Sequence, residues 1–404
     1  MTRFFARTGP IMATTALAAA VPLPAHADWI ASWAAAPQQP HPGFGPVAAT
    51  PSFQNRTLRQ VLRVSAGGSA VRLLISNAYG TTALAIGGAS IALVDDNGHE
   101  IAGTVRRLSF GSAPTAQAAR GAPLLSDAVA LRVPALAHLA VTLYLPGDTG
   151  PCTCHQSGLE ATEVSPPGDF TQTGFTADST AKVGAFLAAV EVDAPSRAAT
   201  LVTLGDSITD GVGSTPGAAR RWPDDLATRL ARRGHRAWGV ANEAISGNRL
   251  LGDGAGENAL ARLDRDVFGL PGVRALIVFE GVNDIGTAFG EPGGPFASYT
   301  RSLPDRMTDA ADMIAGYRQI IARAHVHGIK VIGATIAPFK GATYWSPAGE
   351  AVRQQVNAFI RSGAFDAVLD FDRVLADPAD PQAIRSDYHM GDHLHGSDAG
   401  YQAL

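Results

Sequence analysis

The chain has 404 residues, of which 46% are hydrophobic and 17% are charged. This length is enough for two domains, and the hydrophobic content supplies a sizeable core and argues against a disordered chain. The formal net charge of −4 lacks the strongly basic character of nucleic-acid-binding proteins, so we expect no nucleic acid partner. Only 2 cysteines are present, which excludes a scaffold held together by several disulfides.

Residues 1–27 have the pattern of an export signal. Arg3 and Arg7 give a positive start, an apolar run covers residues 11–21, and Ala25-His26-Ala27 is a small-residue cleavage pattern. We therefore expect cleavage after Ala27 and a secreted or periplasmic protein, the alternatives being an uncleaved anchor or an ordinary N-terminal helix. No later segment reaches the roughly 18 uncharged apolar residues of a membrane-spanning helix, so we expect no transmembrane anchor after cleavage.

The cysteines, Cys152 and Cys154, are separated only by Thr153. A bridge at this spacing is close to the upper limit of the Cα separation that a disulfide tolerates. Two free thiols, a strained bridge and a metal-binding pair all remain open, and so does a redox role.

Residues 28–195 show the two-residue period of β-strands. Val71, Leu73 and Ile75 belong to one alternating run, and residues 139–145 contain a second. Asn97-Gly98 is typical of a hairpin turn. We predict a β-sandwich accessory domain over residues 28–195.

In residues 196–404 short apolar runs alternate with segments of helical period. This order is typical of βαβ units and predicts a doubly wound parallel sheet in an α/β domain. In such sheets ligands bind beyond the carboxyl ends of the strands. The predicted strands are 199–204, 237–242, 275–279, 331–336 and 367–371, and the predicted helices between them end at Gly234, Gly328 and Gly363.

Four of these strands are followed by residues that suit nucleophilic catalysis. The turn Gly205-Asp206-Ser207 presents a serine hydroxyl, which needs a nearby base to become a nucleophile. Gly247 and Asn283 follow the next two strands and offer a backbone N–H and an amide as donors to an anion. Asp392 and His395 are three residues apart, a spacing that lets the carboxylate orient the imidazole. Each motif alone is also typical of a turn, but together at one edge of a sheet they predict a serine site.

A metal site is the alternative for the last motif. His389, His393 and His395 with Asp387 offer metal-ligating side chains, and His389 and His393 are four residues apart. Their spacings match no standard motif with a third ligand nearby, so we expect neither a metal nor a cofactor.

The four motifs resemble the sequence blocks of the GDSL-type, or SGNH, serine hydrolases, and the resemblance covers residues 199–404. It implies a flavodoxin-like sheet and ester hydrolysis without a cofactor. The N-terminal half, beginning with Trp29-Ile30-Ala31-Ser32-Trp33, is similar to the accessory domain of secreted family members, including esterases associated with xylan.

The resemblance also implies roles for individual residues. Ser207 would be the nucleophile, His395 the base and Asp392 its orienting partner. The N–H groups of Ser207 and Gly247 and the side chain of Asn283 would form the oxyanion hole. Neighbouring residues that we consider as substrate contacts are Asn248, Arg249, Asp284, Tyr344 and Trp345.

We expect a secreted serine esterase that works through an acyl-enzyme and removes short acyl groups, above all acetyl, from carbohydrate such as acetylated polysaccharide. Lysophospholipid or lipase-like esters and simple carboxylic esters are alternative substrates. A catalytically inactive glycan-binding or structural envelope protein is the alternative from another class. The sequence does not indicate an oligomeric state.

Two segments of the second half carry further expectations. Loops 286–304 and 338–347 should set specificity, because they lie at the same ends of the strands. A helix begins at Asp398 and the sequence ends at Leu404, whereas family members usually continue. We therefore expect a truncated sequence and a weakly packed last helix.

Overall fold

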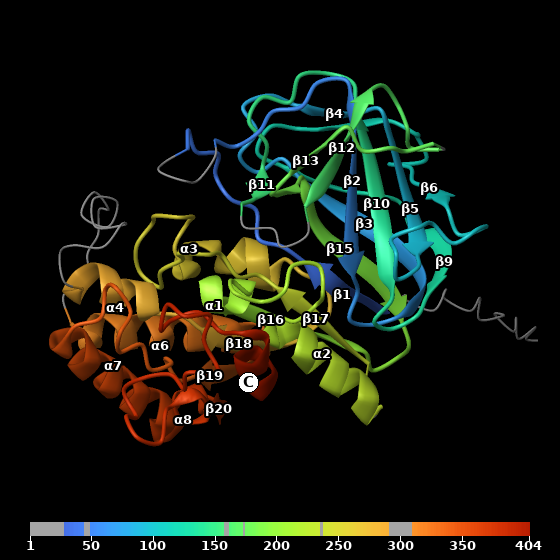
Figure 1. Ribbon diagram of the computed structural model, residues 1–404. Coiled ribbons are helices and arrows are strands. Elements are labelled where there is room, and N and C mark those ends of the chain that lie inside the picture. Colours follow the sequence, from blue (N-terminus) through green and yellow to red (C-terminus); the bar gives the residue numbers. More distant parts are fainter. Residues whose placement is uncertain (1–27, 44–48, 157–160, 173, 235–236, 291–308) are drawn as a thin grey trace, which may run out of the picture.

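The computed structural model describes residues 28–43, 49–156, 161–172, 174–234, 237–290 and 309–404. The predicted export signal, residues 1–27, lies outside these ranges. A strand-rich N-terminal part, blue to green, lies above a C-terminal part in which helices surround a sheet (Figure 1).

The N-terminal part is built from antiparallel strands. One sheet has the order β1-β15-β3-β8, with β9 also paired to β3, and contains β1 (Asp28–Ala34), β3 (Gly68–Ser76), β8 (Pro123–Leu125), β9 (Val129–Val133) and β15 (Leu187–Ala194). The other has the order β13-β12-β2-β10-β5-β6 and contains β2 (Arg56–Arg63), β5 (Gly88–Val94), β6 (Arg106–Arg107), β10 (His138–Leu145), β12 (Thr162–Pro167) and β13 (Ser179–Ala181). Two short pairs join β4 (Leu84–Ile86) to β7 (Ala116–Ala118) and β11 (Cys154–His155) to β14 (Gly184–Ala185).

Alternate residues of both sheets enter one hydrophobic core. Val71, Leu73 and Ile75 of β3 are fully buried, and so are the alternating residues Leu139, Val141 and Leu143 of β10. In β3 the residues between them are only partly buried, so its two-residue period reflects one buried face, whereas Ala140 and Thr142 on the other face of β10 are buried as well. The prediction of antiparallel strands in this half is confirmed.

The C-terminal part contains one parallel sheet with the order β17-β16-β18-β19-β20. All five predicted strands are present, as β16 (Ala199–Gly205), β17 (Trp238–Asn242), β18 (Val273–Phe279), β19 (Lys330–Ala334) and β20 (Ala367–Leu369). The last strand is shorter than predicted, because Phe371 begins a helix instead. In chain order this is the 2-1-3-4-5 arrangement of flavodoxin-like sheets, which places ligand chemistry at the carboxyl end of its first strand.

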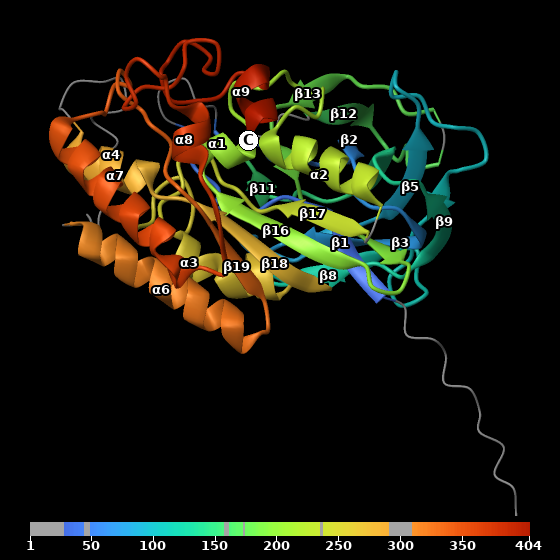
Figure 2. The same ribbon diagram turned by 90° about the horizontal axis from the view of Figure 1, so that it is seen from below.

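Helices cover both faces of this sheet, as the predicted doubly wound fold requires. Figure 2 shows α2, α8 and α9 on one side of the sheet and α3 and α6 on the other. The helices are α1 (Ser207–Asp210), α2 (Trp222–Arg233), α3 (Ala259–Leu263), α4 (Val282–Phe289), α6 (Ala310–Val326), α7 (Pro347–Phe359), α8 (Phe371–Leu375) and α9 (Asp398–Ala403). Helix α2 ends directly before Gly234, whose left-handed backbone closes it as predicted.

The two parts pack directly against each other. The backbone N–H of Ala31 in β1 donates to Thr200 Oγ1 at 2.9 Å, and the N–H of Val240 in β17 donates to Ser65 Oγ at 2.7 Å. A Cβ atom at Gly239 would overlap the carbonyl oxygen of Ala31, so glycine permits this close approach. The change from antiparallel to parallel sheet falls between Ala194 and Ala199.

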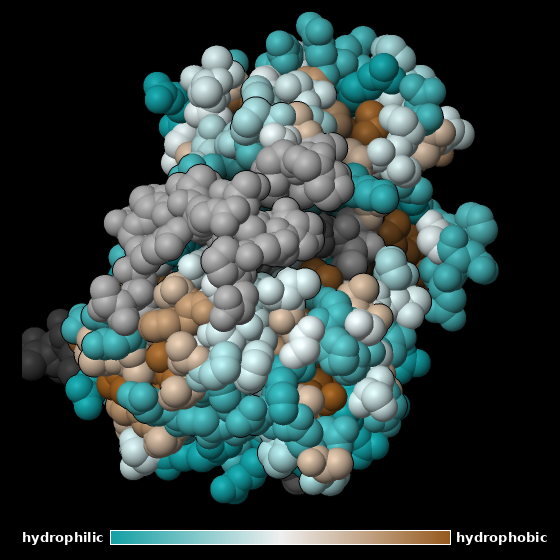
Figure 3. All heavy atoms as spheres, turned by 60° about the vertical axis from the view of Figure 1, so that its left-hand side comes forward, coloured by the Kyte–Doolittle hydropathy of each residue, from teal (hydrophilic) through white to brown (hydrophobic). Residues whose placement is uncertain are grey.

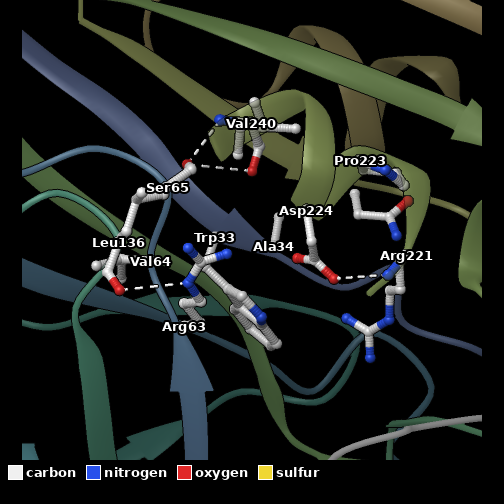
Figure 4. Close-up of a pocket in the computed structure, with 12 residues that line it drawn as sticks. Trp33, Ala34, Arg63, Val64, Ser65, Leu136, Arg221, Pro223, Asp224 and Val240 are labelled. Carbon is white, nitrogen blue, oxygen red and sulfur yellow. Dashed lines mark hydrogen bonds between the residues drawn. The ribbon is translucent and has the colours of Figure 1, made fainter. Parts of the chain in front are cut away.

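A small solvent-open hollow lies in this seam and is lined by residues of both parts. Figure 4 shows Arg63 and Ser65 from the N-terminal part facing Arg221 and Asp224, which begin helix α2. The seam is therefore lined by polar groups as well as by the ring of Trp33.

Cys152 and Cys154 form a disulfide, with 5.3 Å between their Cα atoms. This finding selects the bridge among the three possibilities that the sequence left open. Both residues are buried, and the second of them begins strand β11.

The short C-terminal helix α9 is better anchored than expected. Tyr401 is fully buried, and its hydroxyl donates to the carbonyl of Val212 beside helix α1. The expectation of weak packing is therefore wrong. The buried ring and hydroxyl of Tyr401 anchor this helix although it is short.

Among the described residues, no helix is both long and apolar enough to cross a membrane. On the face shown in Figure 3, hydrophobic residues occur in small separate groups within a mostly hydrophilic surface.

Candidate active site

The site begins where strand β16 turns sharply into helix α1. A Cβ atom at Gly205 would overlap the side chain of Thr209, so only glycine fits this turn. Asp206 caps the helix by accepting the N–H of Ile208 at 2.9 Å. Ser207 is consequently the first residue of the helix, with its hydroxyl at the carboxyl edge of the sheet.

Ser207, His395 and Asp392 form one hydrogen-bonded chain. The Oγ of Ser207 lies 2.8 Å from Nε2 of His395, and Nδ1 of His395 lies 2.6 Å from Oδ2 of Asp392. The other oxygen of Asp392 accepts the N–H groups of Leu394 and His395, each at 3.0 Å. Partial burial disfavours the charge of Asp392, but its hydrogen bonds with His395 outweigh burial and hold its pKa well below the usual range.

This geometry assigns the proton positions on His395. An ionised carboxylate can only accept, so Nδ1 of His395 carries a hydrogen. The neutral ring then presents the lone pair of Nε2 to the hydroxyl of Ser207, which is the arrangement of a general base with its nucleophile.

Three donors lie at the ends of the neighbouring strands. The backbone of Gly247 is left-handed, with a φ of 81°, which glycine adopts without strain. Among the described residues, no acceptor is found for the N–H groups of Ser207 and Gly247. The Nδ2 of Asn283 donates one hydrogen to the carbonyl of Asn248 at 2.9 Å, which leaves its second hydrogen available.

The three predicted substrate contacts nearest these donors are buried and have protein partners. The oxygens of Asp284 accept the N–H groups of Leu250 and Leu251 at 2.8 and 3.1 Å. Arg249 donates to the carbonyl of Asp253, and Asn248 Nδ2 donates to the carbonyl of Glu257. These side chains hold the loop that carries Gly247, and their predicted contact with substrate stays a prediction.

Tyr344 and Trp345 lie on the loop after β19 and are half-buried. The hydroxyl of Tyr344 is 3.5 Å from Oδ1 of Asn283, so its ring lies beside a donor of the site. Gly286 allows this approach, because a Cβ there would overlap the ring. The predicted loop 286–304 is partly wrong, since residues 286–289 belong to helix α4 and residues 291–308 lie outside the described ranges.

The histidines near the end of the chain do not gather into a metal site. Within the described residues, no group of three or more potential metal-ligating side chains occurs. The Nδ1 of His389 instead accepts the N–H groups of Gly391 and His393 at 3.0 and 3.2 Å. Asp387 is paired with Arg385 at 3.0 Å, which accounts for the fourth member of the suggested set.

Comparison with known families decides what this arrangement belongs to. The sequence model of the GDSL-like lipase/acylhydrolase family matches residues 203–403. The chain carries a GDSL-family hydrolase domain. A search of curated proteins found no match to the chain.

Solved structures similar to the chain each match about half of it. They include a GDSL-like lipase from Bacteroides thetaiotaomicron, with 19% identity over 50% of this chain and 82% of that chain and a TM-score of 0.36. A lipase/acylhydrolase from Enterococcus faecalis has 19% identity over 50% of this chain and 90% of that chain, with a TM-score of 0.37. A variant of Axe2, an acetyl xylan esterase from Geobacillus stearothermophilus, has 19% identity over 51% of this chain and 90% of that chain, with a TM-score of 0.36.

Sequence reasoning missed the residue at the centre of the GDSL hydrolase domain, Arg262 of helix α3. Its fully buried guanidinium donates to Oδ1 of Asn248 at 2.8 and 3.0 Å and to the carbonyl of Glu243 at 2.5 Å. It also pairs with Asp266 at 3.1 Å. Arg262 therefore ties the end of β17 to the loop that carries Gly247. An arginine in a short, otherwise apolar helix was the only signal in the sequence.

Buried carboxyls also surround the catalytic edge of the GDSL hydrolase domain. Glu243 and Glu280 directly follow strands β17 and β18, and burial raises the pKa of each well above its ordinary value. Burial likewise raises the pKa of Asp284 to about 6 and that of Asp206 to about 7. These groups resist ionisation because little solvent reaches them.

We expect the Asp206→Asn variant to gain stability relative to the native chain as the pH rises. With the ordinary value near 4, the unfolded chain ionises first, so the native protein loses stability between about pH 4 and about pH 7, where the folded carboxyl titrates. Asparagine does not ionise and is an equally good helix cap. Urea unfolding at pH 4 and at pH 8 should show a relative gain of about 2–4 kcal/mol at the higher pH. If the free energies of unfolding of the two proteins changed equally between pH 4 and pH 8, the argument that burial raises the pKa of Asp206 would be contradicted.

We expect the Asn283→Ala variant of the GDSL hydrolase to lose about a hundredfold in kcat with little change in KM. The resemblance implies that this amide donates to an oxyanion that exists only along the reaction path, and a donor of that kind can be lost without weakening substrate binding. Steady-state kinetics with nitrophenyl acetate provide the measurement. Thr287→Ala is the matched control, because Thr287 lies one turn further along α4 and its hydroxyl donates only to helix carbonyls, those of Asn283 and Asp284. An equal loss of kcat in Thr287→Ala would show that disturbance of helix α4, and not loss of the Asn283 amide, lowers the rate.

Proposed function

We propose that Ser207 is the nucleophile of this esterase, His395 its general base and Asp392 the residue that orients His395. In acylation, Ser207 Oγ attacks the ester carbonyl while Nε2 of His395 takes the hydroxyl proton. The carbonyl oxygen becomes an oxyanion and accepts hydrogen bonds from the N–H groups of Ser207 and Gly247 and from Asn283. His395 then protonates the leaving alkoxide, and the acyl group stays on Ser207.

Deacylation repeats these steps with water. His395 takes a proton from water, whose oxygen attacks the acyl carbonyl, and the same donors bind the second oxyanion. The bond to Ser207 Oγ then breaks, His395 returns the proton to the serine, and the carboxylic acid leaves. No cofactor is needed, because every proton moves between Ser207, His395, the leaving alkoxide and water.

The observation that carries this proposal is the hydrogen-bonded chain from Ser207 Oγ to His395 and Asp392, at 2.8 and 2.6 Å. Labelling with a fluorophosphonate, followed by peptide mapping, tests it. We expect the label on Ser207. Absence of label on a folded protein would overturn the proposal and favour an inactive binding protein. Label on another residue would overturn the proposal by identifying a different nucleophile.

We further propose that the substrates are short acyl esters of carbohydrate, such as acetylated xylan. The base is accessible, since the side chains of His395 and Asp392 are 18% and 39% exposed. The adjoining surface carries polar residues, among them His389 and His393. An accessible polar rim suits the hydroxyl-rich alcohol part of a sugar ester, and the ring of Tyr344 beside Asn283 limits the space next to the oxyanion donors.

A release assay tests this choice of substrate. Acetylated xylan, nitrophenyl acetate, nitrophenyl octanoate and a lysophospholipid would be compared at equal ester concentration. We expect kcat/KM to be highest for the acetyl esters and lowest for the lysophospholipid. A preference for the long-chain esters would instead favour the lipase-like alternative while leaving the catalytic residues unchallenged.

We also propose that the protein is exported, with cleavage after Ala27, and that the two antiparallel sheets of residues 28–195 act as a β-sandwich accessory domain. The sequence pattern of residues 1–27 supports export, and so does the Cys152–Cys154 disulfide, because disulfides persist in oxidising compartments. N-terminal sequencing of protein recovered outside the cytoplasm should begin at Asp28. A mature chain that retains residues 1–27 would contradict this proposal.

A further inference from the structure

A buried ion pair joins the N-terminal part of the chain to the helix that carries Ser207. His155 belongs to strand β11 and directly follows the disulfide cysteine Cys154. Its Nε2 lies 2.9 Å from Oδ1 of Asp210, the last residue of helix α1. The side chains of His155 and Asp210 are only 8% and 5% exposed, so water cannot readily replace either partner.

Both ring nitrogens of His155 face acceptors. The Nδ1 lies 3.1 Å from the carbonyl oxygen of Ala36, which can only accept, so this nitrogen carries a hydrogen. The Nε2 faces a carboxylate, which makes the ring a cation when Asp210 is ionised. Burial lowers the pKa of His155, but the charge of Asp210 and the hydrogen bonds outweigh burial and raise it, while His155 in turn helps to lower the pKa of Asp210. Arg221 also acts on this pair through its charge, and Asp210 acts in the same way on the neighbouring Asp206.

The second oxygen of Asp210 reaches the loop of the oxyanion donors. Oδ2 accepts the hydroxyl of Ser246 at 2.6 Å and the N–H of Ser246 at 3.1 Å. Gly247, whose N–H is a proposed oxyanion donor, is the next residue. Asp210 is itself the last residue of the helix that begins with Ser207, and its carboxylate binds Ser246, the residue before Gly247. It therefore links this helix to the loop that carries Gly247.

We infer that His155 is a positioning residue for the oxyanion loop and acts on it through Asp210 and Ser246. This inference rests on the proposed role of Gly247 in the reaction. Without His155, the carboxylate of Asp210 would remain buried without its cationic partner, and it would either take up a proton or move toward solvent. Either change weakens its hold on Ser246 and displaces the adjacent donor. The N-terminal part thus completes the active site without touching the substrate.

The inference predicts a specific kinetic signature for two His155 variants. His155→Leu removes both donors, and we expect kcat for nitrophenyl acetate to fall about 10- to 100-fold while KM changes less than about threefold, because an oxyanion donor acts on the transition state. His155→Gln keeps an N–H donor close to the position of Nε2, and we expect it to recover a large part of the lost kcat. Rates would be normalised to the number of sites that a fluorophosphonate labels to completion.

Ser65→Ala is the matched control. It removes buried hydrogen bonds of the same seam, one from the N–H of Val240 and one to the carbonyl of Ser32, but neither bond reaches the loops of the site. We expect its kcat to stay within about twofold of the native value at a comparable loss of thermal stability. An equal loss of kcat in Ser65→Ala, an unchanged kcat in His155→Leu, or no recovery in His155→Gln would overturn the inference. Native protein that turns over no ester would instead overturn the proposed function itself.

The adjacent disulfide supplies an independent test. If it acts by holding His155, replacing Cys152 and Cys154 by serine should lower kcat in the native background and cause no further loss in the His155→Leu background. Equal losses of kcat in both backgrounds would show that the disulfide does not act through His155. That outcome would count against the inferred positioning by strand β11.

Discussion

Replacing Ser207 by alanine is expected to lower kcat by about a thousandfold or more. The variant keeps the oxyanion donors and the His395–Asp392 pair, but no acyl-enzyme can form without the hydroxyl. The fold should be unaffected, because Ser207 Oγ contacts His395 and is not required by the turn, which depends on Gly205 and Asp206. Initial rates with nitrophenyl acetate, together with the loss of fluorophosphonate labelling, provide the measurement.

Ser214→Ala is a suitable control for this experiment. Ser214 is buried, follows helix α1 closely, and its hydroxyl only donates to the carbonyl of Gly211 at 2.7 Å. We expect a modest loss of stability and an almost native kcat. Native turnover in Ser207→Ala would mean that another group attacks the ester, and the proposed mechanism would fail.

Replacing Asp392 by asparagine is expected to lower kcat by about a thousandfold, although the change is nearly isosteric. The side-chain oxygen of asparagine would accept the N–H groups of Leu394 and His395, as Oδ1 of Asp392 does. Its amide hydrogens would then face Nδ1 of His395, so that nitrogen must become an acceptor. The proton moves to Nε2, and His395 can no longer take the hydroxyl proton of Ser207.

The same loop offers a control for this change. Asp387 is more than half exposed and pairs with Arg385 at 3.0 Å, so Asp387→Asn removes a carboxylate of the same segment without reaching His395. Exposed ion pairs contribute little, and we expect kcat within about twofold of the native value. A native rate in Asp392→Asn would show that the orientation of His395 does not depend on the carboxylate.

The proposed oxyanion site depends on buried charges that come from several segments. Arg262 of α3 holds Asn248, Asp284 holds Leu250 and Leu251, and Asp210 holds Ser246. Each of these polar groups forms a hydrogen bond to one or more of residues 246–251 in the loop that carries Gly247. Substitutions of these groups should consequently change kcat even though none of them lies in the chain from Ser207 to Asp392.

Much of the fold could be predicted because it depends on local patterns. Period-two burial in β3 and continuous burial in β16 follow from which faces of a sheet are covered. The order of short strands and helices then leaves few parallel topologies. Because parallel strands end at one edge, the sequence also predicts that Ser207, Gly247 and Asn283 share one site.

The sequence by itself determined the kind of sheet, the edge that carries the chemistry and the candidate nucleophile and donors, because these residues closely follow strand ends. The candidate base, His395, is indicated by its three-residue spacing from Asp392, since helix α8 separates this pair from the end of β20. Only the tertiary structure decided which buried polar groups pair with one another. His155 and Asp210 are 55 residues apart, and Arg262 meets the carbonyls of segments that a linear pattern does not connect. Such pairings depend on how distant segments pack, and each buried charge takes whichever partner the packing brings within reach. For this reason only the structure showed that Asn248, Arg249 and Asp284 form hydrogen bonds with the loop that carries Gly247, and that the strand-rich half reaches the helix of Ser207.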